Sequence, residues 1–171
     1  MQKNIVYIVV PFLLFSIFSG CRSKKEKGTA GGSPQPEEIS AYGMTLTAES
    51  PPEKVAGLLI KALDNGDMDI LKKLVAVEDA RKETEAIFGK YGKATDMTSE
   101  KVSGLVIAGW KASYAFFREG QTSIFGIKVE GGNAEVYATA VNKSTGKNGK
   151  ILICLVKENG WWKVKAGIKT L

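Results

Sequence analysis

The spacing of apolar residues changes once along this chain, near Gly120, and that change limits the folds available to it. Before this glycine, apolar residues recur at the spacing of about 3.6 that is typical of helices, as Val55, Leu58 and Leu59 do. After it the period becomes two, which is typical of strands with one buried face. Helices followed by strands, rather than helices alternating with strands, indicate an α+β fold.

Four segments are predicted to be helical. Their approximate ranges are 51–64, 67–75, 78–90 and 98–117. The first helix begins at Ser50-Pro51-Pro52-Glu53, which combines an N-cap residue, prolines suited to the first turn and an acid near the positive end of the helix dipole. Asn65-Gly66 ends it, and Asp67 is expected to cap the second helix.

Four strands are predicted in the remaining part of the chain. They cover residues 125–129, 134–140, 151–158 and 162–168. Gly131-Gly132 and the segment 144–149 separate the first three strands, and Asn159-Gly160 is the strongest hairpin signal in the sequence. Short turns between consecutive strands predict a four-stranded antiparallel sheet in which each strand pairs with the next.

The N-terminus has the pattern of a targeting signal. Lys3 precedes the apolar run 5–18, and Ser19-Gly20-Cys21 follows, in the order of a secretory signal and its cleavage site. Residues 18–21 resemble the lipobox of bacterial lipoproteins. The resemblance implies cleavage between Gly20 and Cys21 and a lipid on Cys21. The chain is therefore expected to be anchored in the cell envelope. Arg22, which follows that cysteine, favours the outer membrane.

The next segment is expected to be a flexible tether. Residues 22–49 are rich in Lys, Gly, Ser and Pro and show almost no apolar periodicity. The predicted organisation is a signal peptide over 1–20, the lipidated cysteine and tether over 21–49, and one α+β domain over 50–171. Cys21 and Cys154 are the only cysteines. Because the lipid uses the first, the domain must fold without a disulfide, and Cys154 is expected to be buried.

Two motifs resemble the nuclear-transport-factor-2-like (cystatin-like) superfamily. One leads from Ser50-Pro51-Pro52-Glu53 to Asn65-Gly66-Asp67, and the other is the closing hairpin 158–164. The resemblance covers roughly residues 49–169. It implies that N-terminal helices pack on a curved four-stranded antiparallel sheet and enclose a conical space. In this superfamily that space is an active site in some members and a binding cleft or plain core in others.

The composition argues against catalysis. The sequence contains no histidine, which removes the commonest general base and metal ligand. One remaining cysteine is too few for a zinc site. Glu135 and Tyr137 form an acid–phenol pair, but the opposite parity of their strand carries the alanines that suit packing on a helix. This pair is therefore expected on the outer face. No catalytic residue, metal or cofactor is predicted.

An aromatic set stands as the candidate lining of a cleft. Its members are Phe88, Tyr91, Trp110, Tyr114, Phe117 and Trp162. They either surround a flat apolar ligand or form the core, and the core is favoured. Trp161, Lys163 and Lys165 have the parity opposite to Trp162 and are expected on an exposed basic outer face, as a surface contact or as a solvated face.

The function predicted from these features is a membrane-anchored lipoprotein with a non-catalytic binding domain. From residue 142 onward the chain has seven Lys and one Glu, which favours a protein or anionic partner in the envelope. Nucleic acid is not expected. A homodimer through the outer sheet face is a further possibility that the resemblance implies. Two alternatives remain open, namely a carrier of apolar small molecules or lipids in the helix–sheet cleft, and a histidine-free isomerase or hydrolase.

Overall fold

The computed structural model describes residues 38–89 and 97–171. In chain order the elements are β1 (Ile39–Ala41), β2 (Met44–Leu46), α1 (Pro52–Asn65), α2 (Met68–Leu74), α3 (Val77–Gly89), α4 (Ser99–Tyr114), β3 (Phe117–Glu130), β4 (Asn133–Asn142), β5 (Asn148–Glu158) and β6 (Trp161–Thr170). The predicted α+β class is confirmed, and each helix begins within two residues of its predicted start.

The four long strands form an antiparallel sheet in the order β3-β4-β5-β6, as predicted. Asn159 and Gly160 turn the chain between the last two strands with φ of 50° and 84°, the left-handed pair that a tight hairpin requires. β3 is interrupted by a bulge at Phe125, because Ile124 lies opposite Ala138 whereas Gly126 lies opposite Tyr137. Because of this bulge, Phe125 lies beside Tyr137 on the outer face, whereas Ile127 and Val129 lie opposite the inner positions of β4.

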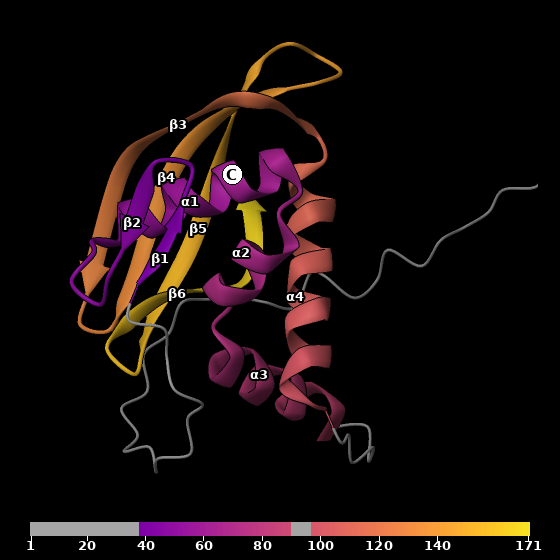
Figure 1. Cartoon of the computed structure of the whole chain (residues 1–171). Helices are drawn as coiled ribbons and strands as arrows, with labels where there is room; N and C mark the ends of the chain where they lie inside the picture. The colour runs from indigo at the N-terminus through magenta and orange to yellow at the C-terminus, as the bar shows by residue number, and fades with distance from the viewer. Residues whose placement is uncertain (1–37, 90–96) are drawn as a thin grey trace, which may run out of the picture.

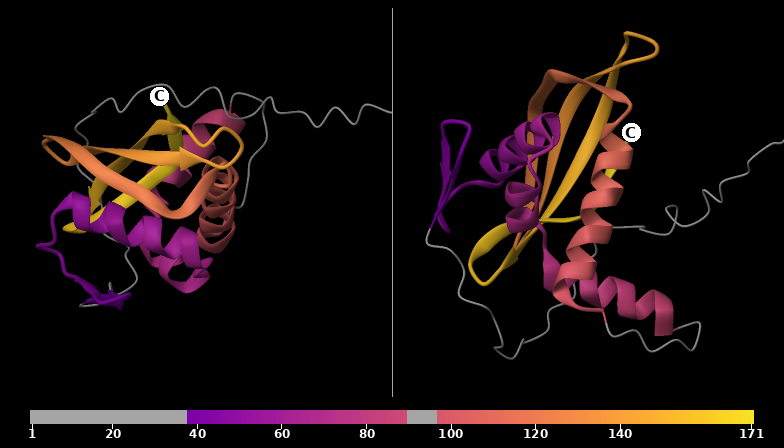
Figure 2. Two further views of the ribbon diagram at one scale, coloured as in Figure 1. Left: turned by 90° about the horizontal axis from the view of Figure 1, so that it is seen from above. Right: turned by 45° about the vertical axis from the view of Figure 1, so that its right-hand side comes forward.

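The concave face of the sheet is buried beneath the helices. Figures 1 and 2 show α1 crossing this face and α4 standing along β6. On β4 the inner positions are Ala134, Val136, Ala138 and Ala140, none more than 2% exposed. Three of these residues are alanines, whose short side chains let the helices approach the sheet closely. The prediction that these alternating residues face the helices is confirmed.

The helix caps differ in part from the prediction. Asp67 caps α2, because its Oδ1 accepts a hydrogen bond of 3.1 Å from the Ile70 amide. Ser50, predicted to cap α1, instead accepts a 2.9 Å bond from the Thr47 amide. The residue before α1 is Pro51, which makes no side-chain cap bond. Ser50 therefore fixes the turn leading into the helix rather than the helix end.

The free edge of β6 is covered by the segment after α2. Val75 forms a parallel bridge with Val164, and the Ala76 amide donates a 2.9 Å bond to the Val164 carbonyl. The chain then enters α3, so α2 and α3 approach the sheet from the β6 side.

The folded domain begins earlier than predicted. Residues 39–46 were expected to belong to the tether, but β1 and β2 pair as a hairpin whose turn is Tyr42-Gly43, with φ of 52° and 71°. Ile39 and Leu46 are each 1% exposed and belong to the core. The predicted boundary at 49 is therefore wrong, because three-residue strands are too short to show periodicity. The predicted signal peptide, and the tether before residue 38, lie outside the described residues.

Removing this hairpin should destabilise the domain. A chain starting at Ala48 loses two side chains whose burial stabilises by about 1.5–3 kcal/mol each. Thermal unfolding followed by circular dichroism should show a melting temperature lower by roughly 5–15 °C than that of a chain starting at Glu38. The chain starting at Glu38 should melt like one starting at Arg22, because every residue of the core cluster lies between Ile39 and Ile168. Equal melting of all three would mean that the hairpin adds no stability.

Candidate functional site

The described members of the aromatic set are buried. Trp110, Tyr114, Phe117 and Trp162 are exposed by 0%, 5%, 3% and 8%. The indole Nε1 of Trp110 donates a 3.0 Å hydrogen bond to the Lys165 carbonyl, which joins α4 to β6. Tyr91 and the side chain of Phe88 lie outside the described residues. The arrangement favours the core interpretation of this set, because these rings are packed among the core side chains.

A polar cluster that the sequence analysis missed lies where α1, α4 and β3 meet. The Tyr114 hydroxyl is 2.7 Å from the Thr122 hydroxyl. Asp64 Oδ2 accepts a 3.1 Å bond from the Gly120 amide, and its other oxygen is buried. Burial and the nearby Asp64 carboxylate raise the pKa of Tyr114 far above its usual value. The phenol is therefore held protonated, which suits a structural role better than proton transfer near neutral pH.

The prediction of an exposed basic face is wrong for Trp161 and Lys163. They are 7% and 5% exposed, and Lys163 Nζ donates a 2.5 Å bond to the Lys73 carbonyl at the end of α2. Their parity on β6 is as expected. No pattern in the sequence indicates that α2 and α3 fold around this strand. Burial lowers the pKa of Lys163.

Lys165 is also turned toward a helix. Its ammonium lies 3.2 Å from Asp79 Oδ1 on α3, with side-chain exposures of only 12% and 23%. Glu158, in the hairpin between β5 and β6, accepts a 2.8 Å bond from the Asp79 amide and so caps the first turn of α3. Burial raises the pKa of Glu158. These contacts attach α3 to β6 through charges.

Glu83 completes this charged contact, one turn after Asp79 on α3. One oxygen of each carboxylate is buried and accepts no hydrogen bond among the described residues. Burial first, and the Asp79 carboxylate second, raise the pKa of Glu83, while Lys165 and Lys169 act in the opposite direction. Lys165 already neutralises Asp79, so these charges attach α3 to the sheet. We therefore interpret the two carboxylates and the lysine as a structural contact that holds the helix.

The raised pKa of Glu83 makes a pH dependence predictable. A carboxyl group whose pKa is higher in the folded state binds its proton more tightly there, so it favours folding at low pH. That contribution is lost as the pH rises through the folded pKa. Glu83→Gln should therefore raise the melting temperature at pH 7, and the gain should shrink toward pH 4.

The matched control for this change is Glu85→Gln on the same helix. Its side chain is 57% exposed, so the substitution should leave the melting temperature nearly unchanged at both pH values. If Glu83→Gln lowered the melting temperature at pH 7, the carboxylate would be stabilising α3 and the argument from burial would fail.

The outer face of the sheet holds the acid–phenol pair, as predicted. The Tyr137 hydroxyl donates a 2.5 Å bond to Glu135 Oε2. This bond raises the pKa of Tyr137. Both side chains are half-buried on the face away from α1 and α4, and Cys154, which lies opposite Glu135 on β5, is 3% exposed. The expected burial of that thiol is confirmed.

Two further observations bear on the possible chemistry of the domain. The described residues contain no group of three or more Cys, Asp or Glu side chains placed to hold a metal ion. No described helix is long and apolar enough to span a membrane. Cys21 and Gly20, the predicted lipidation and cleavage residues, lie outside the described part of the chain.

The comparisons with known proteins give distant structural neighbours. No protein-family model matches the sequence, and no curated protein matches it. A candidate NTF2-like transpeptidase from Campylobacter jejuni shares 18% identity with a TM-score of 0.44, over 68% of this chain and 98% of that one. A DUF4783 family protein from Bacteroides ovatus shares 14% identity with a TM-score of 0.41, over 72% of this chain and 97% of that one. At such scores the likeness says nothing about activity.

Proposed function

We propose that this chain is a lipid-anchored protein of the cell envelope, favoured in the outer membrane, whose folded domain binds a partner and catalyses no reaction. The claim that the domain catalyses no reaction is supported by where its ionisable side chains lie. Apart from Tyr114, whose phenol is held protonated in the core, the described ionisable side chains with raised or lowered pKa values lie in helix contacts or on the surface, whereas the interior beneath the helices is packed with apolar side chains.

The lipid anchor is supported by sequence. The order of Lys3, an apolar run and Ser19-Gly20-Cys21 matches that of a lipoprotein signal. A carrier function is less well supported, because the described aromatic residues that would line its cleft are at most 8% exposed. An isomerase or hydrolase needs two ionisable groups converging on a substrate site. The pair formed by Glu135 and Tyr137 instead lies on the outer face.

Acylation at Cys21 has a direct test. Cells expressing the full chain should incorporate radiolabelled fatty acid into the wild-type protein, and Cys21→Ala should abolish the label and release the protein from the detergent phase. Cys154→Ala is the matched control, since Cys154 is the only other cysteine, and it should keep the label. An unlabelled wild type, or a labelled Cys21→Ala protein, would contradict the anchor.

A second copy of the chain is the partner we propose for the outer sheet face. Phe125 is 56% exposed there, and its ring centroid lies 6.2 Å from that of Tyr137. Charges of both signs surround the rings, including the Lys128–Glu130 pair at 2.8 Å and Lys150, whose Nζ is 6.0 Å from the Phe125 ring. A two-fold interface needs such a self-complementary patch, because each residue group meets its own copy.

Sedimentation equilibrium of the chain from residue 22 onward tests this interface. The wild type should dimerise, and Phe125→Asp should give a monomer because the interface would bury an unpaired carboxylate. Leu105→Asp is the control, since Leu105 is equally exposed at 56% but lies on α4. A wild type that stays monomeric at every concentration, or a Leu105→Asp protein that dissociates as well, would refute the outer face as the interface.

A further inference from the structure

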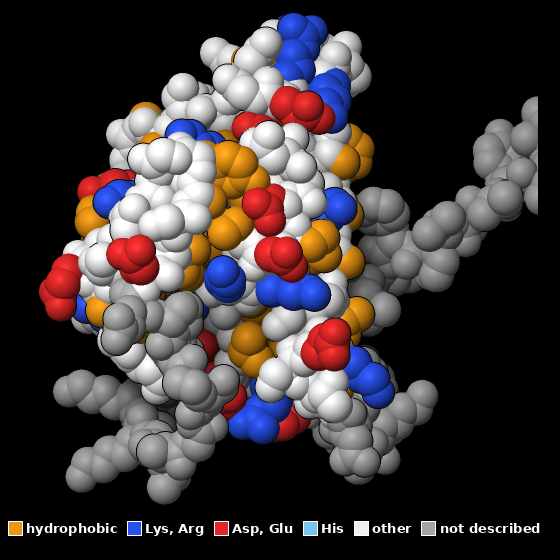
Figure 3. All heavy atoms as spheres, viewed as in Figure 1, with side chains coloured by type: hydrophobic (Ala, Val, Ile, Leu, Met, Phe, Trp, Pro, Cys, Tyr) orange, Lys and Arg blue, Asp and Glu red, His pale blue; other side chains and the backbone are white. Residues whose placement is uncertain are grey.

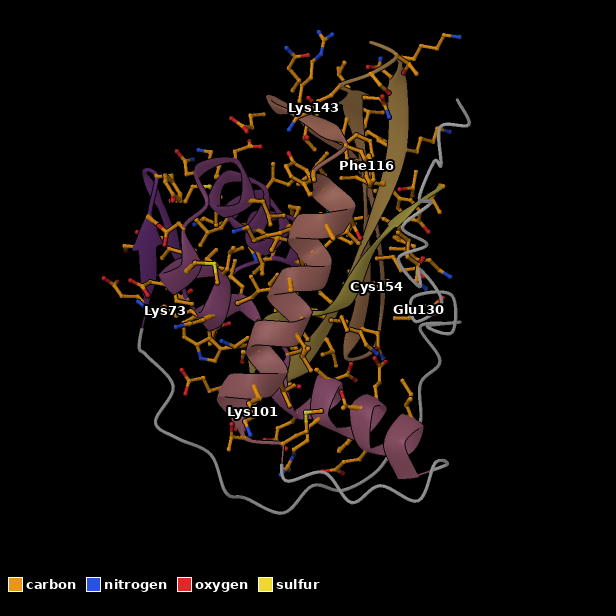
Figure 4. The ribbon with its side chains drawn as sticks, turned by 90° about the vertical axis from the view of Figure 1, so that its right-hand side faces the viewer. Lys73, Lys101, Phe116, Glu130, Lys143 and Cys154 are labelled. Atoms are coloured by element: carbon orange, nitrogen blue, oxygen red, sulfur yellow. The ribbon has the colours of Figure 1, made fainter. Side chains whose placement is uncertain are left out.

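One end of the molecule combines an exposed aromatic ring with cations. It is formed by the entry to β3 and the turn between β4 and β5, and we call it the basic tip, defined by Phe116, Arg118, Lys143 and Lys147. The Lys143 amide donates a 2.8 Å bond to the Phe116 carbonyl, which fixes the turn against the strand entry. Figure 4 shows Phe116 and Lys143 together at the end of the molecule where α4 terminates.

The turn of the basic tip is rigidly built. The Asn142 side-chain oxygen accepts bonds from the amides of Ser144 and Thr145, at 2.9 and 3.1 Å, and from the Ser144 hydroxyl at 2.7 Å. The Asn142 amide in turn donates a 2.9 Å bond to the Lys147 carbonyl. The lysines of this turn are therefore presented on a fixed backbone, which reduces the entropy lost on binding.

Phe116 is exposed although its neighbour is not. Its exposure is 60%, against 3% for Phe117, which packs into the core. Beside the two rings lies an open hollow of about 370 Å³, whose lining also includes Asn142, Thr145, Lys147, Asn148, Gly149 and Thr170. A large exposed ring above such a hollow is a recognisable contact feature, because aromatic rings carry much of the binding energy at interfaces.

The charge around this ring is positive. Arg118, Lys143 and Lys147 are exposed, and none of them is in an ion pair with another described residue. Within the segments 115–119 and 142–149 the only acid is Glu119. Figure 3 shows Lys and Arg side chains gathered at the top of the molecule, above the rest of the surface. They are different cations from Lys163 and Lys165, which the sequence predicted on an exposed face of β6.

We infer that the basic tip docks on the surface of an anionic lipid bilayer. The three cations would lie against the headgroup phosphates, and the Phe116 ring would enter the interfacial region, where an apolar ring flanked by cations is favoured. An anionic bilayer fits both features, whereas a soluble anion needs only the cations. The inference does not depend on Cys21, since an unlipidated chain carries the same surface.

Vesicle flotation tests the inference on the chain from residue 22 onward, which has neither the apolar N-terminal run nor Cys21 and its lipid. Vesicles of phosphatidylcholine with phosphatidylglycerol should bind the protein at low salt at least tenfold more tightly than pure phosphatidylcholine. Added salt should weaken this binding, because the Debye length falls to ~8 Å at physiological ionic strength. Lys143→Gln combined with Lys147→Gln should weaken it about tenfold or more.

Three controls separate the basic tip from net charge and from folding defects. Lys72→Gln combined with Lys82→Gln removes two exposed lysines elsewhere and should change binding by about twofold at most. Phe116→Ser should weaken binding without altering its salt dependence, whereas Leu105→Ser should leave it unchanged. Arg118→Gln gives an independent variant of the tip, and the melting temperature of each variant should match that of the wild type.

Several results would overturn the inference. The first is a wild type that does not bind the anionic vesicles at low salt. The second is an equal loss of affinity in the two double variants, which would make net charge alone responsible. Full competition by millimolar inorganic phosphate would assign the tip to a soluble anion instead. These outcomes are distinct from failure of the lipid anchor, because no variant in this test carries a lipid.

Discussion

Burial of the concave sheet face beneath α1 and α4 is the constraint on which the rest of this structure depends. The row of small residues on β4 lets the helices lie close, and the buried indole of Trp110 fixes α4 to β6 through the Lys165 carbonyl. Because the helices use this face fully, an approaching partner has only the outer face, the strand edges and the ends of the sheet. We therefore expect a partner to bind at the surface of the domain.

The features that could be predicted from sequence are those set by local geometry. Asn159-Gly160 predicted its hairpin because few other residue pairs accept two consecutive left-handed conformations. Asp67 predicted the N-terminal cap of α2, and the alternating alanines predicted the inner face of β4. Each of these signals lies within a few residues of the structure that it specifies.

The features that could not be predicted depend on contacts between distant segments. Lys163 alternates like a surface residue, but the end of α2 covers it ninety residues away in sequence. The cap of α3 by Glu158 has a similar origin, since the acid comes from a hairpin rather than from the residues before the helix. The β1–β2 hairpin was not predicted for another reason. Only two of its residues, Ile39 and Leu46, are buried, and two residues are too few to show a period.

The bridge between Val75 and Val164 has a consequence for how the main sheet can grow. It covers the free edge of β6 at Val164, and among the four strands of the main sheet β3 is then the edge that pairs on one side only. A sheet with two open edges can add copies without end, as fibres do. With a single open edge, two molecules that join through it leave no further edge to extend, so growth of that kind stops at a pair.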